Sequence, residues 1–173
     1  MGDPFSAFLS ESPAMRKSVG RARIAARHSF PVLIQGEPGT GKLLLGRMIH
    51  QASTLADEPW VVVDCATIPP DVLSARVFGH SKGALPGTDK SGKGLLATAA
   101  GGTVWLGDVA RLPVEGQVRL LELLATGSVS PVGAASPQPL DVRIIATTDS
   151  NLLDKVRTGQ FLHELYYALA VAM

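Results

Sequence analysis

One stretch decides the fold of this chain: residues 31–42, which read PVLIQGEPGTGK. The stretch begins with an apolar run, which predicts a short buried strand over 31–35, and it ends abruptly in glycine. A helix is predicted to begin near Lys42, with a buried stripe of Leu44, Leu45, Met48 and Ile49. Residues 36–42 have the spacing of a phosphate-binding loop and stand between a strand and a helix, where that motif has to stand. A glycine turn that only reverses the chain is the alternative interpretation.

The chemistry of phosphate binding explains the residue types in this loop. Glycines let backbone amides wrap an anion closely, and the N-terminus of the following helix adds a partial positive charge. Lys42 is expected to reach the terminal phosphates of ATP or ADP, whereas Leu43 replaces the usual Ser or Thr whose hydroxyl binds magnesium, so one magnesium contact is missing. The predicted nucleotide-binding residues are Gly36, Glu37, Pro38, Gly39, Thr40, Gly41, Lys42 and Leu43.

The alternation of strand and helix continues on both sides of the loop. Further strands are predicted over 60–64, 103–106 and 142–147, and further helices over 13–26, 71–77, 114–125 and 151–157. In the first helix Met15, Val19 and Ile24 are expected to face the core. Continuously apolar strands have to be covered on both faces, so the pattern predicts a parallel sheet in a three-layer αβα sandwich. Residues 128–132 alternate weakly and contain a proline, which predicts an exposed edge hairpin.

Composition and charge exclude several classes of protein. The 173 residues fall within the roughly 100–200 of one domain, so we expect a single domain over 1–173 with an irregular start over 1–12. A net charge of +1 offers no broad basic surface for direct contact with nucleic acid. No apolar run approaches the roughly 18 residues of a membrane span. The single cysteine excludes an internal disulfide, which favours a cytoplasmic protein.

A hydrolase with such a loop also needs acidic residues at the end of another buried strand, one to hold magnesium and one to activate water. The strand over 103–106 is followed by Gly107 and Asp108, so only one carboxylate is present. Asp108 is the candidate catalytic residue and candidate magnesium ligand, with a loop cap as the alternative interpretation. Asp64, after the strand over 60–64, is a second candidate catalytic residue, and a solvated loop carboxylate is its alternative.

Several motifs in order carry a family resemblance. The phosphate loop is similar to a Walker A motif, residues 101–106 to the approach to a Walker B motif, and residues 142–147 to a sensor I strand. Residues 63–69, 77–80 and 161–169 match further conserved segments of the same family. The sequence resembles the AAA+ domain of bacterial enhancer-binding proteins, which remodel sigma-54 RNA polymerase. The resemblance implies a P-loop NTPase fold with a parallel five-stranded sheet, and ATP-driven rings with sigma-54 RNA polymerase or related AAA+ subunits as partners.

The departures from the family pattern concern catalysis and the partner loop. The family's GAFTGA loop is replaced here by Gly83, Ala84, Leu85, Pro86, Gly87 and Thr88. The Asp-Glu pair of Walker B corresponds to Gly107 and Asp108. The asparagine that couples nucleotide to the loop corresponds to Asp64, and the sensor I asparagine to Thr148. The two arginine fingers of the family correspond to Leu162 and Ala168.

These departures favour a domain that binds nucleotide, hydrolyses it weakly or not at all, and regulates transcription through protein partners. One alternative is an active ATPase that remodels sigma-54 RNA polymerase and uses Asp108 and Asp64. A second alternative is a structural interaction module that binds no nucleotide. The family's helical lid and helix-turn-helix have no counterpart up to Met173, so the fold is expected to lack them.

Overall fold

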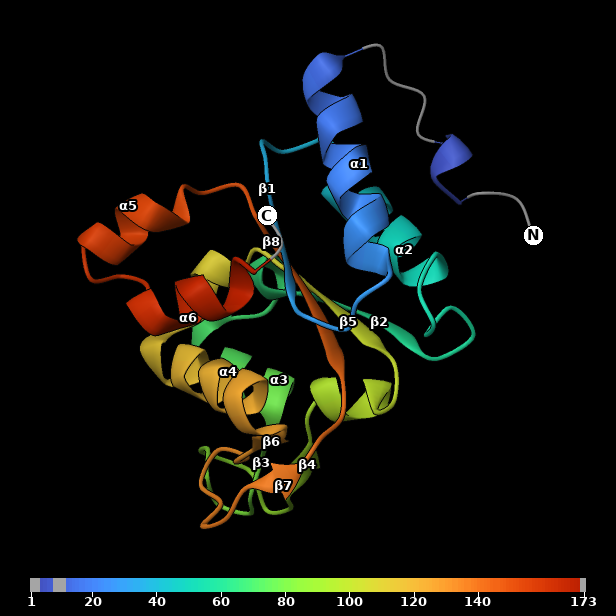
Figure 1. Cartoon of the computed structure of the whole chain (residues 1–173). Coiled ribbons are helices and arrows are strands. Elements are labelled where there is room, and N and C mark those ends of the chain that lie inside the picture. The colour runs from blue at the N-terminus through green and yellow to red at the C-terminus, as the bar shows by residue number, and fades with distance from the viewer. Residues whose placement is uncertain (1–3, 8–11, 172–173) are drawn as a thin grey trace.

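A parallel sheet forms the centre of the computed structural model, which describes residues 4–7 and 12–171 (Figure 1). Its strands are β1 (Val32–Gln35), β2 (Trp60–Asp64), β5 (Thr103–Gly107) and β8 (Arg143–Thr148), in the order β1-β8-β5-β2. All three pairings are parallel, which confirms the predicted fold class. The expected count of five strands is wrong for the described residues, which place four in this sheet. The chain after β8 folds as two helices, so it supplies no further strand.

Helices cover both faces of the sheet. They are α1 (Pro13–Ala26), α2 (Lys42–Gln51), α3 (Pro70–Phe78), α4 (Val114–Thr126), α5 (Leu152–Arg157) and α6 (His163–Leu169). Helices α1 and α2 pack on one face, whereas α3, α4 and α6 pack on the other (Figure 1). Side chains of a strand alternate between faces. In β5, therefore, Trp105 joins the first core, while Val104 and Leu106 join the second.

Two residues that were predicted to lie in the core are exposed, and one helix was not predicted from the sequence. Ile24 of α1 is 62% exposed, because α1 buries the small residues Ala22, Ala25 and Ala26 instead. Leu44 of α2 is 48% exposed, whereas Leu45, Met48 and Ile49 are buried as predicted. Helix α6 was not expected as a helix. Its seven residues are too few for a clear helical period, and it is stabilised by packing on α4.

Two small hairpins lie beside α4, below the central sheet in the view of Figure 1. Strand β3 (Gly79–His80) pairs antiparallel with β4 (Gly92–Lys93), and β6 (Ser128–Val129) with β7 (Gln138–Pro139). The second pair confirms the predicted edge hairpin. The segment before α1 includes a 3-10 turn over Pro4–Ala7 within the expected irregular start. Over the described ranges, no helix has both the length and the apolar character needed to span a bilayer.

Polar side chains are buried where the strands begin, at the edge of the sheet opposite the phosphate loop. His50 of α2 is 4% exposed, and its Nδ1 lies 3.0 Å from Oγ1 of Thr103. The guanidinium of Arg143 is also buried and donates to the carbonyl of Ala25 at 2.7 Å. Burial lowers the pKa of His50, and the charges of Arg143 and Arg47 lower it further. Folding therefore favours the neutral form of His50.

The lowered pKa of His50 predicts a pH-dependent stability. Below about pH 6.5 the unfolded chain binds a proton that the folded chain rejects. The free energy of unfolding should therefore fall as the pH is lowered through this range, by at most about 1.4 kcal/mol per pH unit, and stop falling below the folded pKa. Urea unfolding across this range measures the effect, which His50→Asn should reduce. His163→Asn, at an exposed position, should leave it in place, and equal pH dependence in all three proteins would contradict the prediction.

Candidate functional site

The phosphate loop connects the end of β1 to the start of α2, as predicted. Gly39 and Gly41 have φ angles of 78° and 83°, a left-handed conformation that side chains disfavour. Gly41 is the N-cap residue of α2, so the loop leads directly into a helix N-terminus. A cavity of about 270 Å³ is lined by this loop together with residues of α1, Met15 and Ser18 among them. The geometry suits a phosphate group, because backbone amides and a helix N-terminus converge there.

The side chain of Lys42 folds back onto the loop. Its Nζ donates to the carbonyl oxygens of Gly36 at 2.6 Å and of Glu37 at 2.8 Å. The hydroxyl of Thr40 also donates to the Glu37 carbonyl, at 2.7 Å. The ammonium therefore lies within the loop, where phosphate oxygens would be alternative acceptors. Leu43 is 43% exposed and offers no oxygen ligand beside it.

Thr148, at the position of the sensor asparagine, links the phosphate loop to Asp108. It ends β8, which lies between β1 and β5. Its carbonyl accepts from the backbone N–H of Gly36 at 3.2 Å, and its hydroxyl donates to Oδ1 of Asp108 at 3.4 Å. The phosphate loop and Asp108, both predicted from the sequence, therefore lie at one edge of the sheet, and the buried residue Thr148 connects them.

Asp108 pairs with a cation that the sequence analysis missed. Its Oδ2 accepts from Nε of Arg111 at 2.6 Å. The hydrogen bond and charge of Asp108 raise the pKa of Arg111, with smaller contributions from Asp149 and Asp64. Asp108 is the one non-glycine residue with a positive φ, 47°, within 4–7 and 12–171. The spacing of three residues between an acid and an arginine at a strand end was the available signal for this pair.

Asp64 takes the role of a cap. Its Oδ1 accepts from the N–H of Ala66 at 2.9 Å and so stabilises the short 3-10 turn over Cys65–Thr67. In the sheet it lies opposite Gly107, next to the end of β5. The neighbouring Cys65 is buried, and burial raises the pKa of its thiol to about 12, so this thiol is not a nucleophile near neutral pH.

The space beside Gly107 is filled by an aromatic ring. A Cβ atom at residue 107 would overlap the ring of Trp105, and a Cβ at Gly46 of α2 would lie 2.9 Å from the same ring. The ring therefore occupies the volume that a carboxylate at residue 107 would need. In the described part of the chain no three His, Cys, Asp or Glu side chains gather in a group that could hold a metal ion. The magnesium site of a Walker B motif does not fit these residues.

The candidate partner loop, residues 83–88, lies between β3 and β4 and closes on itself. The backbone N–H of Gly83 donates to Thr88 at 2.8 Å, and the N–H of Thr88 donates to Leu85 at 3.1 Å. At its base, Ser81 donates to the carbonyl of Val132 at 2.9 Å, and Val132 donates to the carbonyl of Gly79 at 2.9 Å. The two hairpins therefore form one unit.

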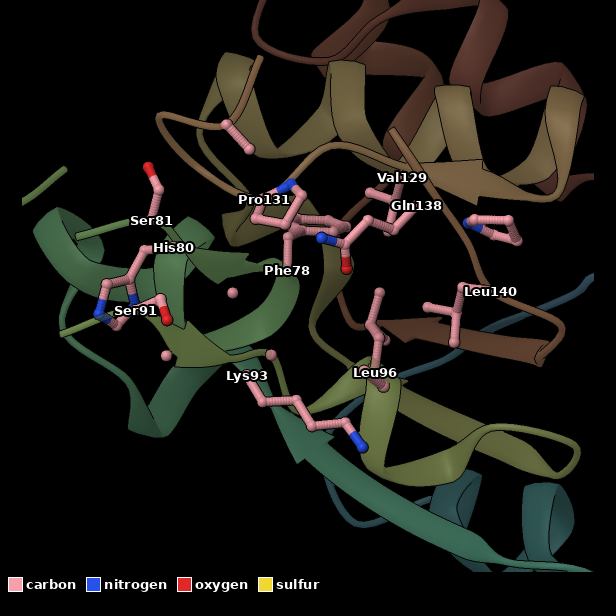
Figure 2. A pocket seen from close by; sticks show the side chains of 16 residues that line it. Phe78, His80, Ser81, Ser91, Lys93, Leu96, Val129, Pro131, Gln138 and Leu140 are labelled. Carbon is pink, nitrogen blue, oxygen red and sulfur yellow. The ribbon is translucent and has the colours of Figure 1, made fainter. Parts of the chain in front are cut away.

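A hollow of about 390 Å³ lies between these hairpins (Figure 2). Figure 2 shows side chains from both hairpins around it, with Phe78, Val129 and Leu140 among its apolar walls and Lys93 beside them. Helix α4 fixes one wall, because both the N–H and the hydroxyl of Ser130 donate to the carboxylate of Glu122, at 3.2 and 3.1 Å. The hollow is a surface feature of the loop base, away from the phosphate loop.

Comparisons with known proteins agree with this architecture. Residues 8–173 match the family described as the Sigma-54 interaction domain. The chain is 41% identical to the response regulator protein FleR of Pseudomonas aeruginosa over 92% of this chain and 34% of that protein. It is 38% identical to the DNA-binding transcriptional regulator NtrC of Escherichia coli K12, over 99% of this chain and 36% of that protein.

Solved structures show the same fold. NtrX from Brucella abortus in complex with ADP superposes with a TM-score of 0.84 at 33% identity, over 94% of this chain and 35% of that one. The P-loop NTPase domain of a sigma-54 activator from E. coli gives a TM-score of 0.62 at 22% identity, over 95% of this chain and 94% of that one, a likeness of fold alone. The chain thus spans about a third of the length of FleR, NtrC and NtrX.

Proposed function

Since this chain belongs to the sigma-54 interaction domain family, we propose that it binds ATP or ADP through residues 36–43, hydrolyses it weakly or not at all, and regulates transcription through protein partners. The single observation that carries the proposal is an intact phosphate loop beside an incomplete acidic pair. Its relatives are transcriptional regulators, so a cytoplasmic role is part of the proposal.

Nucleotide binding is supported by the loop and by a neighbour in structure. The left-handed glycines and the N-terminus of α2 form an anion site, and the ammonium of Lys42 lies within it. NtrX was crystallised in complex with ADP and in complex with ATP. The same loop in this chain is the expected site of either nucleotide.

Weak hydrolysis is supported by the groups around Asp108. Its carboxylate accepts hydrogen bonds from Arg111 and Thr148, so fewer of its lone pairs are open to a water molecule. Gly107 supplies no metal ligand, and Leu162 and Ala168 of the α6 region stand where the family carries arginine fingers. Removing groups that stabilise charge in the transition state lowers the rate by orders of magnitude.

Action through protein partners is supported by the loop over 83–88. This loop is held at its base by hydrogen bonds but carries Leu85 and Pro86 where the family carries an aromatic residue and a threonine. Proline lacks an N–H donor and fixes φ, so we expect this loop to be stiffer than a loop with threonine at residue 86. The proposed partners are related AAA+ subunits in a ring, or sigma-54 RNA polymerase itself.

Calorimetric titration of the purified chain with ATP and magnesium chloride tests the proposal. We expect a saturable binding heat with no sustained heat of turnover. Sustained heat that disappears in Asp108→Asn would contradict it and favour an active ATPase. No heat, together with an unchanged melting temperature in ATP and in ADP, would instead favour an interaction module without nucleotide.

A further inference from the structure

The nucleotide site lacks the side chains that hold magnesium in phosphate-loop proteins. In such sites the ion is bound by a Ser or Thr after the loop lysine and by an aspartate at the end of a neighbouring strand. These positions are Leu43 and Gly107 here, and neither supplies an oxygen from its side chain. Magnesium prefers oxygen ligands in strict octahedral geometry, so the loss of two protein ligands removes most of its fixed coordination.

The packing around β5 leaves no room for one of the missing magnesium ligands, a carboxylate at residue 107. Trp105 is 8% exposed, and its ring lies between the Cα atoms of Gly46 and Gly107, where a carboxylate at residue 107 would have to point. The volume beside Gly107 is therefore filled by the apolar packing of this ring under α2. Asp108 is one residue further along, and its carboxylate already accepts from Arg111 and Thr148.

Arg111 supplies a positive charge at the same edge of the sheet. Its side chain is 60% exposed, and its Nε donates to Asp108 at 2.6 Å. The hydroxyl of Thr148 donates to Asp108, and the backbone N–H of Gly36 donates to the carbonyl of Thr148, so two hydrogen bonds connect the partner of this arginine to the phosphate loop. A guanidinium binds phosphate oxygens in bidentate geometry and remains charged at every physiological pH.

We infer that this site binds the metal-free nucleoside triphosphate, with Arg111 supplying the counter-charge that a divalent cation supplies in other phosphate-loop sites. The inference rests on the proposed binding of nucleotide to the loop over 36–43. It goes further, because it names the ionic form of the ligand and a binding residue outside the loop.

The test is fluorescence anisotropy of N-methylanthraniloyl-ATP with the full chain, in magnesium chloride and in EDTA. The wild-type dissociation constant is expected to agree within about threefold between the two buffers, and Arg111→Met is expected to raise it at least about tenfold in EDTA. Arg157→Met is the matched control, because Arg157 forms an exposed pair with Asp154 at the same spacing but on α5. It should bind as wild type does.

Three results separate the inference from the proposed function. Binding that requires magnesium, with EDTA weakening it by more than about tenfold, would overturn the inference and leave the proposed function standing. Equal binding by Arg111→Met and wild type in EDTA would also overturn it. No binding in either buffer would overturn both. Circular dichroism of Arg111→Met checks that any loss of binding occurs in a folded protein.

A converse variant tests the metal site directly. Leu43→Thr, Trp105→Phe and Gly107→Asp together restore two oxygen ligands and shorten the ring that blocks one of them. In this triple variant magnesium is expected to tighten binding of the same labelled ATP by at least about tenfold. A folded triple variant that responds to magnesium no more than wild type does would contradict the account of Trp105 and Gly107.

Discussion

Replacement of Lys42 by alanine is expected to weaken ATP binding about 100-fold, which corresponds to about 2.7 kcal/mol. The ammonium lies inside the phosphate loop, where it donates to the carbonyls of Gly36 and Glu37. Charge-assisted hydrogen bonds to phosphate are among the strongest that a side chain makes, and alanine supplies neither charge nor donor. Calorimetric titration of the variant with ATP measures the loss.

A lysine elsewhere provides the control for this substitution. Lys17 is exposed on α1, so Lys17→Ala changes the net charge equally without touching the loop. Its ATP affinity should remain within about twofold of wild type. Unchanged affinity in Lys42→Ala would mean that nucleotide, if it binds, does not use the phosphate loop.

Gly94→Ala is expected to destabilise the protein by about 3 kcal/mol. Gly94 lies where β4 leaves the base of the partner loop. A Cβ atom there would overlap the backbone of Val77, Phe78 and Gly79. Backbone cannot rotate away as a flexible side chain does, so β4 has to move from β3 or the end of α3 has to shift.

Gly20→Ala is the matched control, because it adds the same methyl group within α1 with no heavy atom within 4 Å. It should stabilise the chain by about 0.5–1 kcal/mol, since alanine is the better helix former. Urea unfolding of both variants measures the contrast. A loss below about 1 kcal/mol in Gly94→Ala would show that the hairpin separates from α3 at low cost.

The sequence predicted the sheet and the phosphate loop well because both depend on local signals. Apolar runs that end in glycine define β1, and a proline after Ser12 defines the start of α1. Burial of single helix positions was predicted less well. The stripe on α1 consists of small alanines, which have little hydrophobic signal, so Ile24 was assigned to the core although it faces outward.

The candidate site was predictable in its parts but not in its connections. From the sequence, Lys42 could be placed at the start of a helix and Asp108 after a strand, and the family resemblance placed Thr148 at the sensor position. The three-residue spacing of Asp108 and Arg111 was a signal for their pairing, but the left-handed backbone at Asp108 is one that a non-glycine residue seldom adopts. The conflict between Trp105 and residue 107 depends on packing across one face of β5, which needs coordinates to be seen.

The ring of Trp105 also orders the substitutions by which a metal-binding carboxylate could return. Gly107→Asp alone meets the ring of Trp105 and is expected to destabilise the fold, whereas Trp105→Phe alone leaves a void under α2 and gains no ligand. Each single substitution is therefore expected to be harmful, whereas the smaller ring of phenylalanine in the double variant is expected to leave more room for the carboxylate. The effects of the two substitutions are therefore coupled through the indole ring of Trp105. Because of this epistasis, a carboxylate at residue 107 is difficult to regain by single substitutions.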